Sequence, residues 1–69
     1  MEGTKFIVLT GRNGAKIAIR AKDILALEDA DKKDMYTNFY NTDVKVVEPN
    51  SKIITYYVKQ TVDEILDRL

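Results

Sequence analysis

Hydrophobic residues follow two different spacings along the chain, and the change between them marks its best-defined segment. Residues 53–58, IITYYV, are almost all β-branched or aromatic, a composition typical of a strand on a half-buried surface. Beyond them, apolar residues recur at intervals of three and four, at Val62, Ile65, Leu66 and Leu69, which predicts one apolar stripe along a helix. We therefore predict a strand followed closely by a short helix.

Thr61 and Glu64 predict where this helix starts. A threonine followed three residues later by a glutamate is the capping-box pattern. In it, the hydroxyl accepts a hydrogen bond from the glutamate amide, and the carboxylate accepts one from the threonine amide. A helix over 62–69 is too short to be stable alone, so we expect its stripe to pack on a sheet.

The first part of the chain predicts a hairpin of two strands, residues 5–10 and 15–20. Both segments are rich in β-prone residues, and Asn13-Gly14 lies between them. Asn-Gly in this position is a strong signal for a two-residue type I′ turn. Such a turn places Val8 opposite Ile19 and puts both side chains on the core side.

Further strands are expected at residues 24–28, ILALE, and 43–48, DVKVVE. The composition of the first also permits a helical turn. The turn at 49–52 contains a proline, whose fixed φ suits a turn, and we expect it to place Glu48 opposite Ile53.

The predicted fold class is α+β and mostly β. It is a small, strongly bent antiparallel sheet, or a barrel-like sheet, of four or five strands with one short C-terminal helix. All 69 residues are expected to form a single domain. The predicted core consists of Phe6, Val8, Ile17, Ile19, Ile24, Leu27, Val44, Val46, Tyr57, Ile65, Leu66 and Leu69.

The size of the chain bears on its assembly. A domain this short buries only about 60% of its unfolded surface and is marginally stable unless something supplements its core. The sequence has no cysteine and no histidine, so disulfides and the usual zinc ligands are excluded. We therefore expect a homo-oligomer. The sequence contains no apolar run long enough for a signal peptide or a membrane span, and we expect a cytoplasmic protein with no membrane partner.

Catalytic and metal-binding patterns are weak. Without histidine or cysteine, the commonest general base and the thiol nucleophile are missing, and we expect no enzyme and no cofactor. Asp29, Asp31 and Asp34 resemble a calcium loop only loosely, because Lys33 and Asp34 stand where that loop needs an oxygen ligand and a glycine. We therefore expect no metal site.

The least ordinary segment of the chain is 35–42, MYTNFYNT, which is polar and aromatic at once. Its spacing is compatible with one helical turn or with an extended conformation, and the pattern does not decide between them. Exposed aromatic residues often anchor protein interfaces. We predict a partner-binding loop formed by Met35, Tyr36, Phe39 and Tyr40.

Charge is unevenly distributed although the net charge is zero. Residues 5–22 carry five basic residues and no acid, whereas residues 23–34 carry five acids and two lysines. A basic hairpin can attract phosphate groups, so binding of a nucleic acid or a nucleotide is an alternative function. The residues expected to bind phosphate are Arg12, Lys16, Arg20 and Lys45.

Several short motifs resemble those of the small FlbD family, which is associated with flagella, and of similar short bacterial and phage proteins. The matching segments are Val8-Leu9-Thr10, Asn13-Gly14, Ile24 with Leu27-Glu28, and residues 58–65, VKQTVDEI. The resemblance implies a small non-enzymatic protein that works through contact with another protein. The sheet is also similar, more weakly, to that of the LytTR DNA-binding domain.

The function expected from the sequence is a small regulatory binding module that acts as a homo-oligomer through protein–protein contact. Two alternatives stay open beside it. The first is phosphate recognition through the basic hairpin, and the second is a phage-encoded inhibitor of a host protein.

Overall fold

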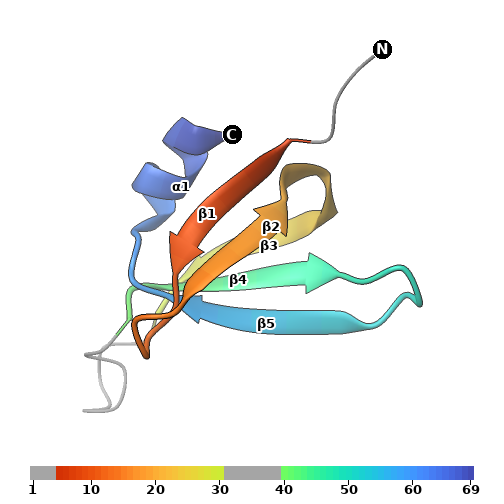
Figure 1. Ribbon diagram of the computed structural model, residues 1–69, viewed down its shortest axis with the longest axis horizontal. Coiled ribbons are helices and arrows are strands. Elements are labelled where there is room, and N and C mark those ends of the chain that lie inside the picture. Colours follow the sequence, from red (N-terminus) through yellow and green to blue (C-terminus); the bar gives the residue numbers. More distant parts are fainter. Residues whose placement is uncertain (1–4, 31–39) are drawn as a thin grey trace.

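The computed structural model describes residues 5–30 and 40–69, which form five strands and one α-helix (Figure 1). This architecture confirms the predicted α+β, mostly β class with one short C-terminal helix. The elements in chain order are β1 (Phe6–Thr10), β2 (Lys16–Arg20), the 3₁₀ turn η1 (Ala21–Asp23), β3 (Ile24–Asp29), β4 (Thr42–Val47), β5 (Ile53–Val58) and α1 (Val62–Arg68).

The strands form two antiparallel sheets that meet at two places. β1 pairs with β2, and β3, β4 and β5 form a three-stranded sheet in that order. The short turn η1 connects the two sheets on one side. On the other side Gly11 forms an antiparallel bridge with Val58, where the Arg12 amide donates to the Tyr57 carbonyl at 3.0 Å. The two sheets therefore surround one common core.

The first hairpin turns through three residues rather than the predicted two. The Gly11 amide donates to the Ala15 carbonyl at 2.7 Å, and the Gly14 amide donates to the Gly11 carbonyl at 2.8 Å. Gly14 has a φ of +88°, the left-handed conformation that closes a three-residue loop built on a type I turn. The predicted pairing of Val8 with Ile19 is therefore wrong by one residue: Val8 pairs with Ala18.

This shift exchanges the two faces of β1, because neighbouring side chains of a strand point to opposite sides. Ile7 and Leu9 are buried, at 4% and 0% exposed. Phe6 and Val8, which were predicted in the core, are 56% and 50% exposed. That prediction was wrong.

The second hairpin shows the same geometry and the same shift. The Glu48 amide donates to the Lys52 carbonyl, and Ser51 closes the loop with a φ of +68°. Ile53 therefore pairs with Val47 and not with Glu48, as predicted. Tyr57 consequently lies on the outer face and is 38% exposed, so its predicted place in the core was wrong.

The core is formed by side chains from both sheets and from one position of the helix. Ile19, Val44, Val46 and Ile65 are buried as predicted, and Ile17, Ile24 and Leu27 are partly buried against them. The core cluster of the described residues consists of Ile7, Leu9, Ile19, Val44, Val46, Val58 and Ile65.

The helix begins as predicted but buries less of its stripe. The amide of Glu64 donates to the Thr61 hydroxyl and the amide of Thr61 donates to the Glu64 carboxylate, both at 3.1 Å, so the capping box is confirmed. Ile65 is fully buried, whereas Leu66 and Leu69 are 54% and 46% exposed. The prediction that Leu66 and Leu69 belong to the core was wrong, because a narrow sheet covers one residue of a two-turn helix and not its whole stripe.

Residues 59–69 hold the outer edge of β1. The side chain of Gln60 accepts from the Thr10 amide at 2.8 Å and donates to the Thr10 hydroxyl at 3.1 Å. Further along, Arg68 donates to the Val8 carbonyl, and Lys5 donates to the Leu69 carbonyl at 2.9 Å. These contacts place α1 beside β1 (Figure 1).

Candidate functional site

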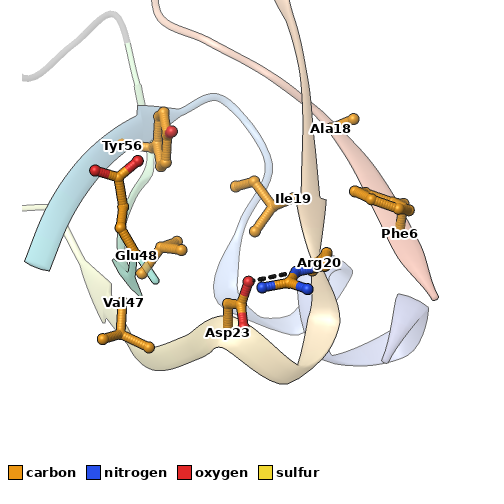
Figure 2. A pocket seen from close by; sticks show the side chains of 9 residues that line it. Phe6, Ala18, Ile19, Arg20, Asp23, Val47, Glu48 and Tyr56 are labelled. Atoms are coloured by element: carbon orange, nitrogen blue, oxygen red, sulfur yellow. Dashed lines mark hydrogen bonds and ion pairs between the residues drawn. The ribbon is translucent and has the colours of Figure 1, made fainter. Parts of the chain in front are cut away.

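A pocket of about 230 Å³ lies between β2 and the adjacent part of β4 and β5 (Figure 2). Its walls come from both sheets and from η1, at the place where the two sheets do not pair with each other. The lining residues are Phe6, Ala18, Ile19, Arg20, Asp23, Val46, Val47, Glu48 and Tyr56.

The polar groups of this pocket are mostly acidic or already paired. Arg20 Nε lies 2.6 Å from Asp23 Oδ2, and this ion pair is visible at the base of Figure 2. Glu48 adds a second carboxylate on the opposite wall. A bound phosphate would meet two carboxylates and one neutralised guanidinium, so the pocket suits an apolar side chain better than an anion.

Of the predicted site residues that the structure describes, only Arg20 lines this pocket. The other lining residues come from β1, β2, η1, β4 with the residue that follows it, and β5. No local motif joins them, and the sequence therefore carried no signal for the pocket.

The predicted partner-binding loop falls largely on residues that the structure does not describe. Met35, Tyr36 and Phe39 lie outside the described residues. Tyr40 is described, and it is buried, at 9% exposed. Its ring packs edge-on against Tyr57, with 5.0 Å between the centroids and an interplanar angle of 61°. Tyr40 therefore packs on the outer face of the three-stranded sheet.

Two charged groups complete the surroundings of this aromatic pair. The Arg12 guanidinium lies over the Tyr57 ring, 5.0 Å from its centroid, which is a favourable cation–π distance. On the other side, burial raises the pKa of the Tyr40 hydroxyl, and the charge of Asp43 and a hydrogen bond to its carboxylate raise it further. The hydroxyl thus stays protonated and serves as a donor to Asp43.

The four residues predicted to bind phosphate are spread over the first loop, β2 and β4. Arg12 is in the first loop and covers Tyr57, and Lys16 is exposed on β2. Arg20 pairs with Asp23, and Lys45 Nζ lies 3.1 Å from Glu28 Oε1 on the three-stranded sheet. Among the residues that the structure describes, two of these four cations therefore have a carboxylate partner.

The part of the chain that the structure describes contains no group of three or more histidine, cysteine, aspartate or glutamate residues placed to hold a metal ion. Within the same residues, no helix has the length and apolar character needed to cross a membrane.

Apolar side chains are exposed on two neighbouring elements, β1 and α1. The contacts of Arg68 with Val8 and of Lys5 with Leu69 hold these elements together. Their exposed fractions are 46–56%, which is high for residues of this size. We define the β1–α1 patch as Phe6, Val8, Leu66 and Leu69.

Comparisons of this chain with protein-family models, with curated proteins and with solved structures find no match. The likeness to the FlbD and LytTR families therefore stays a prediction from the sequence motifs.

Proposed function

We propose that this protein is a small, non-enzymatic regulatory module that acts as a homo-oligomer and binds another protein. The observation that carries the proposal is the β1–α1 patch, in which large apolar side chains remain exposed on adjacent elements. Large apolar side chains that stay exposed on adjacent elements of a small domain are typical of protein-contact surfaces. We retain the cytoplasm as its compartment, an expectation that rests on the sequence.

The size of the patch residues supports this role. Burial of apolar surface contributes about 25 cal/mol per Å², so covering a Phe or Leu side chain that is half exposed contributes on the order of 1 kcal/mol. Aromatic residues are also enriched among the residues that dominate binding energy. Phe6, at 56% exposed, is therefore the expected anchor of the contact.

Phosphate recognition ranks below this proposal. Arg20 and Lys45 would each have to leave a carboxylate partner before binding a phosphate group. Lys16 and Arg12 remain without an acidic partner among the described residues, but they lie on different elements. An inhibitor of a host protein remains a special case of the favoured proposal, because it would use the same kind of apolar contact.

Light scattering on a size-exclusion column tests the proposal. The expected result is a mass that is a multiple of 7.9 kDa and that rises with concentration. Association should persist at high salt, because apolar burial is not screened by ions. A strictly monomeric species across the accessible concentration range would overturn the homo-oligomer.

A further inference from the structure

The outer edge of β5 presents backbone groups that have no hydrogen-bond partner among the described residues. Antiparallel strands alternate between pairs that exchange hydrogen bonds and pairs that do not. The bond from the Glu48 amide to the Lys52 carbonyl sets this alternation for β4 and β5. It follows that Ile53 and Thr55 point their amide and carbonyl groups away from β4, toward the free edge.

The far part of this edge confirms the alternation. Tyr57 has the same parity as Ile53 and Thr55, and its carbonyl indeed accepts from the Arg12 amide of the first hairpin. At residues 53–56 the first hairpin no longer lies against β5, and β5 forms the edge of the three-stranded sheet (Figure 1). Among residues 5–30 and 40–69, no bond reaches the outward groups of Ile53 and Thr55 beyond the β4 ladder.

We propose that two copies of this chain join through these edges, as an antiparallel pair centred on Ile54. The pairing would convert two three-stranded sheets into one continuous six-stranded sheet. This inference rests on the proposed homo-oligomer and assigns its interface. It leaves the β1–α1 patch free for a different protein.

In such a pair, every outward amide and carbonyl group of Ile53 and Thr55 finds a hydrogen-bond partner. With the two-fold axis at Ile54, Ile53 faces Thr55 of the partner subunit, and Thr55 faces Ile53 of the partner subunit. Each of these two pairs exchanges two bonds, so four bonds satisfy all eight outward amide and carbonyl groups.

The position of the first hairpin beside β5 favours this register over the one shifted by one residue. An axis at Thr55 would place Lys52 of the partner subunit opposite Val58, where Gly11 already forms a bridge. An axis at Ile54 places Lys52 of the partner subunit opposite Tyr56 instead. The strand of the partner then enters its turn before it reaches the first hairpin.

Charge favours a second copy as the occupant of this edge. Residues 53–58 contain no charged side chain, so antiparallel self-pairing brings no like charges together. Ile53 is 62% exposed and would gain cover from the adjoining strand. By contrast, self-pairing of β2 about Ala18 would oppose Lys16 to Arg20 of the partner subunit, an arrangement that protects an edge from association.

Substitutions on this edge test the interface by light scattering. Ile53→Lys places a charge on the exposed edge and is expected to weaken self-association at least about tenfold. Its circular dichroism spectrum should match that of wild type, because Ile53 is 62% exposed in the single chain. Thr55→Pro removes an outward amide that has no partner among residues 5–30 and 40–69, and the same loss is expected. Leu25→Lys is the matched control, because it adds the same charge at a residue of β3 that is also largely exposed, at 56%, and its mass should stay that of wild type. Phe6→Lys tests the β1–α1 patch as the competing interface.

A cysteine at the axis tests the register directly, since the natural chain has no cysteine. The two Ile54 residues would form a pair without hydrogen bonds, whose side chains are close enough for a disulfide. Oxidised Ile54→Cys should run as a covalent dimer. Ile53→Cys is the control, because its two copies would be diagonal neighbours about 7–8 Å apart and out of reach of each other.

The outcomes separate this inference from the proposed function. A monomeric wild type overturns both. A wild type that associates, with Ile53→Lys still associated and Ile54→Cys not cross-linked, overturns the β5 interface and leaves the homo-oligomer intact. Dissociation by Phe6→Lys alone would instead assign the interface to the β1–α1 patch.

Discussion

Gly14 and Ser51 occupy equivalent positions in the two hairpin loops, and both have left-handed backbone conformations, with φ of +88° and +68°. Each follows an asparagine whose side chain accepts from the amide two residues further on. The distances are 3.1 Å from Ala15 to Asn13 and 3.2 Å from Lys52 to Asn50. The two loops differ at the left-handed position, where only Ser51 carries a Cβ atom.

Ser51→Gly should therefore stabilise the protein. A left-handed conformation costs an L-residue about 1–2 kcal/mol, and the greater flexibility of glycine in the unfolded chain offsets part of the gain. We expect the free energy of unfolding to rise by about 0.5–1 kcal/mol, measured by urea denaturation.

Gly14→Ala is the complementary variant, and we expect it to lower stability by about 1 kcal/mol. A Cβ atom added at Gly14 would meet no heavy atom within 4 Å, so the loss would report backbone strain and not a collision. Equal stability of Gly14→Ala and wild type would contradict the assigned loop geometry.

Adjacent residues of α1 should respond very differently to truncation. Ile65 is fully buried and Leu66 is 54% exposed. Ile65→Ala should cost about 2–5 kcal/mol, because it leaves a cavity between the helix and the sheets. Leu66→Ala should cost about 0.5 kcal/mol or less. Thermal unfolding followed by circular dichroism compares them, and similar losses for the two variants would show that Leu66 also packs in the core.

The helix should depend on its cap because it has only seven residues. Thr61→Ala removes the oxygen that accepts from the Glu64 amide, and we expect a loss of about 1 kcal/mol. Thr61→Ser keeps that oxygen and should stay within a few tenths of a kcal/mol of wild type. If both variants unfolded at the same denaturant concentration, the hydroxyl would have no role in stability.

Alkaline pH should weaken the wild-type fold through Tyr40. Burial and the charge of Asp43 raise the pKa of Tyr40 above its ordinary value of 10.0. The folded chain therefore retains a proton that the unfolded chain releases, and this contribution to stability is complete below pH 10 and is lost as the pH rises through the folded-state pKa.

Tyr40→Phe cannot ionise at this position and tests the effect. Denaturant titrations between about pH 8 and pH 11 should show a steeper loss of stability in wild type than in Tyr40→Phe. The variant leaves Asp43 without its donor, so its stability at neutral pH is expected to be lower. Parallel pH profiles would show that Tyr40 ionises as freely in the folded chain as in the unfolded one.

Local signals in the sequence were sufficient to locate the elements. The capping pair Thr61 and Glu64 and the β-branched segments placed the helix and the strands to within one or two residues. Val44 and Val46 were also found in the core, because they alternate with polar residues on β4. Each of these features depends on residues that are near neighbours in the chain.

The register of strand pairing in the hairpins could not be predicted from such local signals. Asn13-Gly14 fits a two-residue turn and also the last two positions of a three-residue loop, and the two readings differ by one residue in pairing. On β1 the alternation of apolar and polar residues does not settle the register either. Residues 6–9 are all apolar, so either face of the strand could be the buried one. The pocket could not be predicted from the sequence for a related reason. Its residues are brought together only by the way the two sheets meet.

The pair of hydrogen bonds between Thr10 and Gln60 has a consequence for the order of folding. Its two hydrogen bonds join residues 50 positions apart, and the contacts of β1 with α1 span 60 and 64 positions. Contacts of such long range close slowly, whereas each hairpin needs only its own loop. The hairpins should therefore form as independent early units, and docking of residues 59–69 along β1 should be the late step that sets the folding rate.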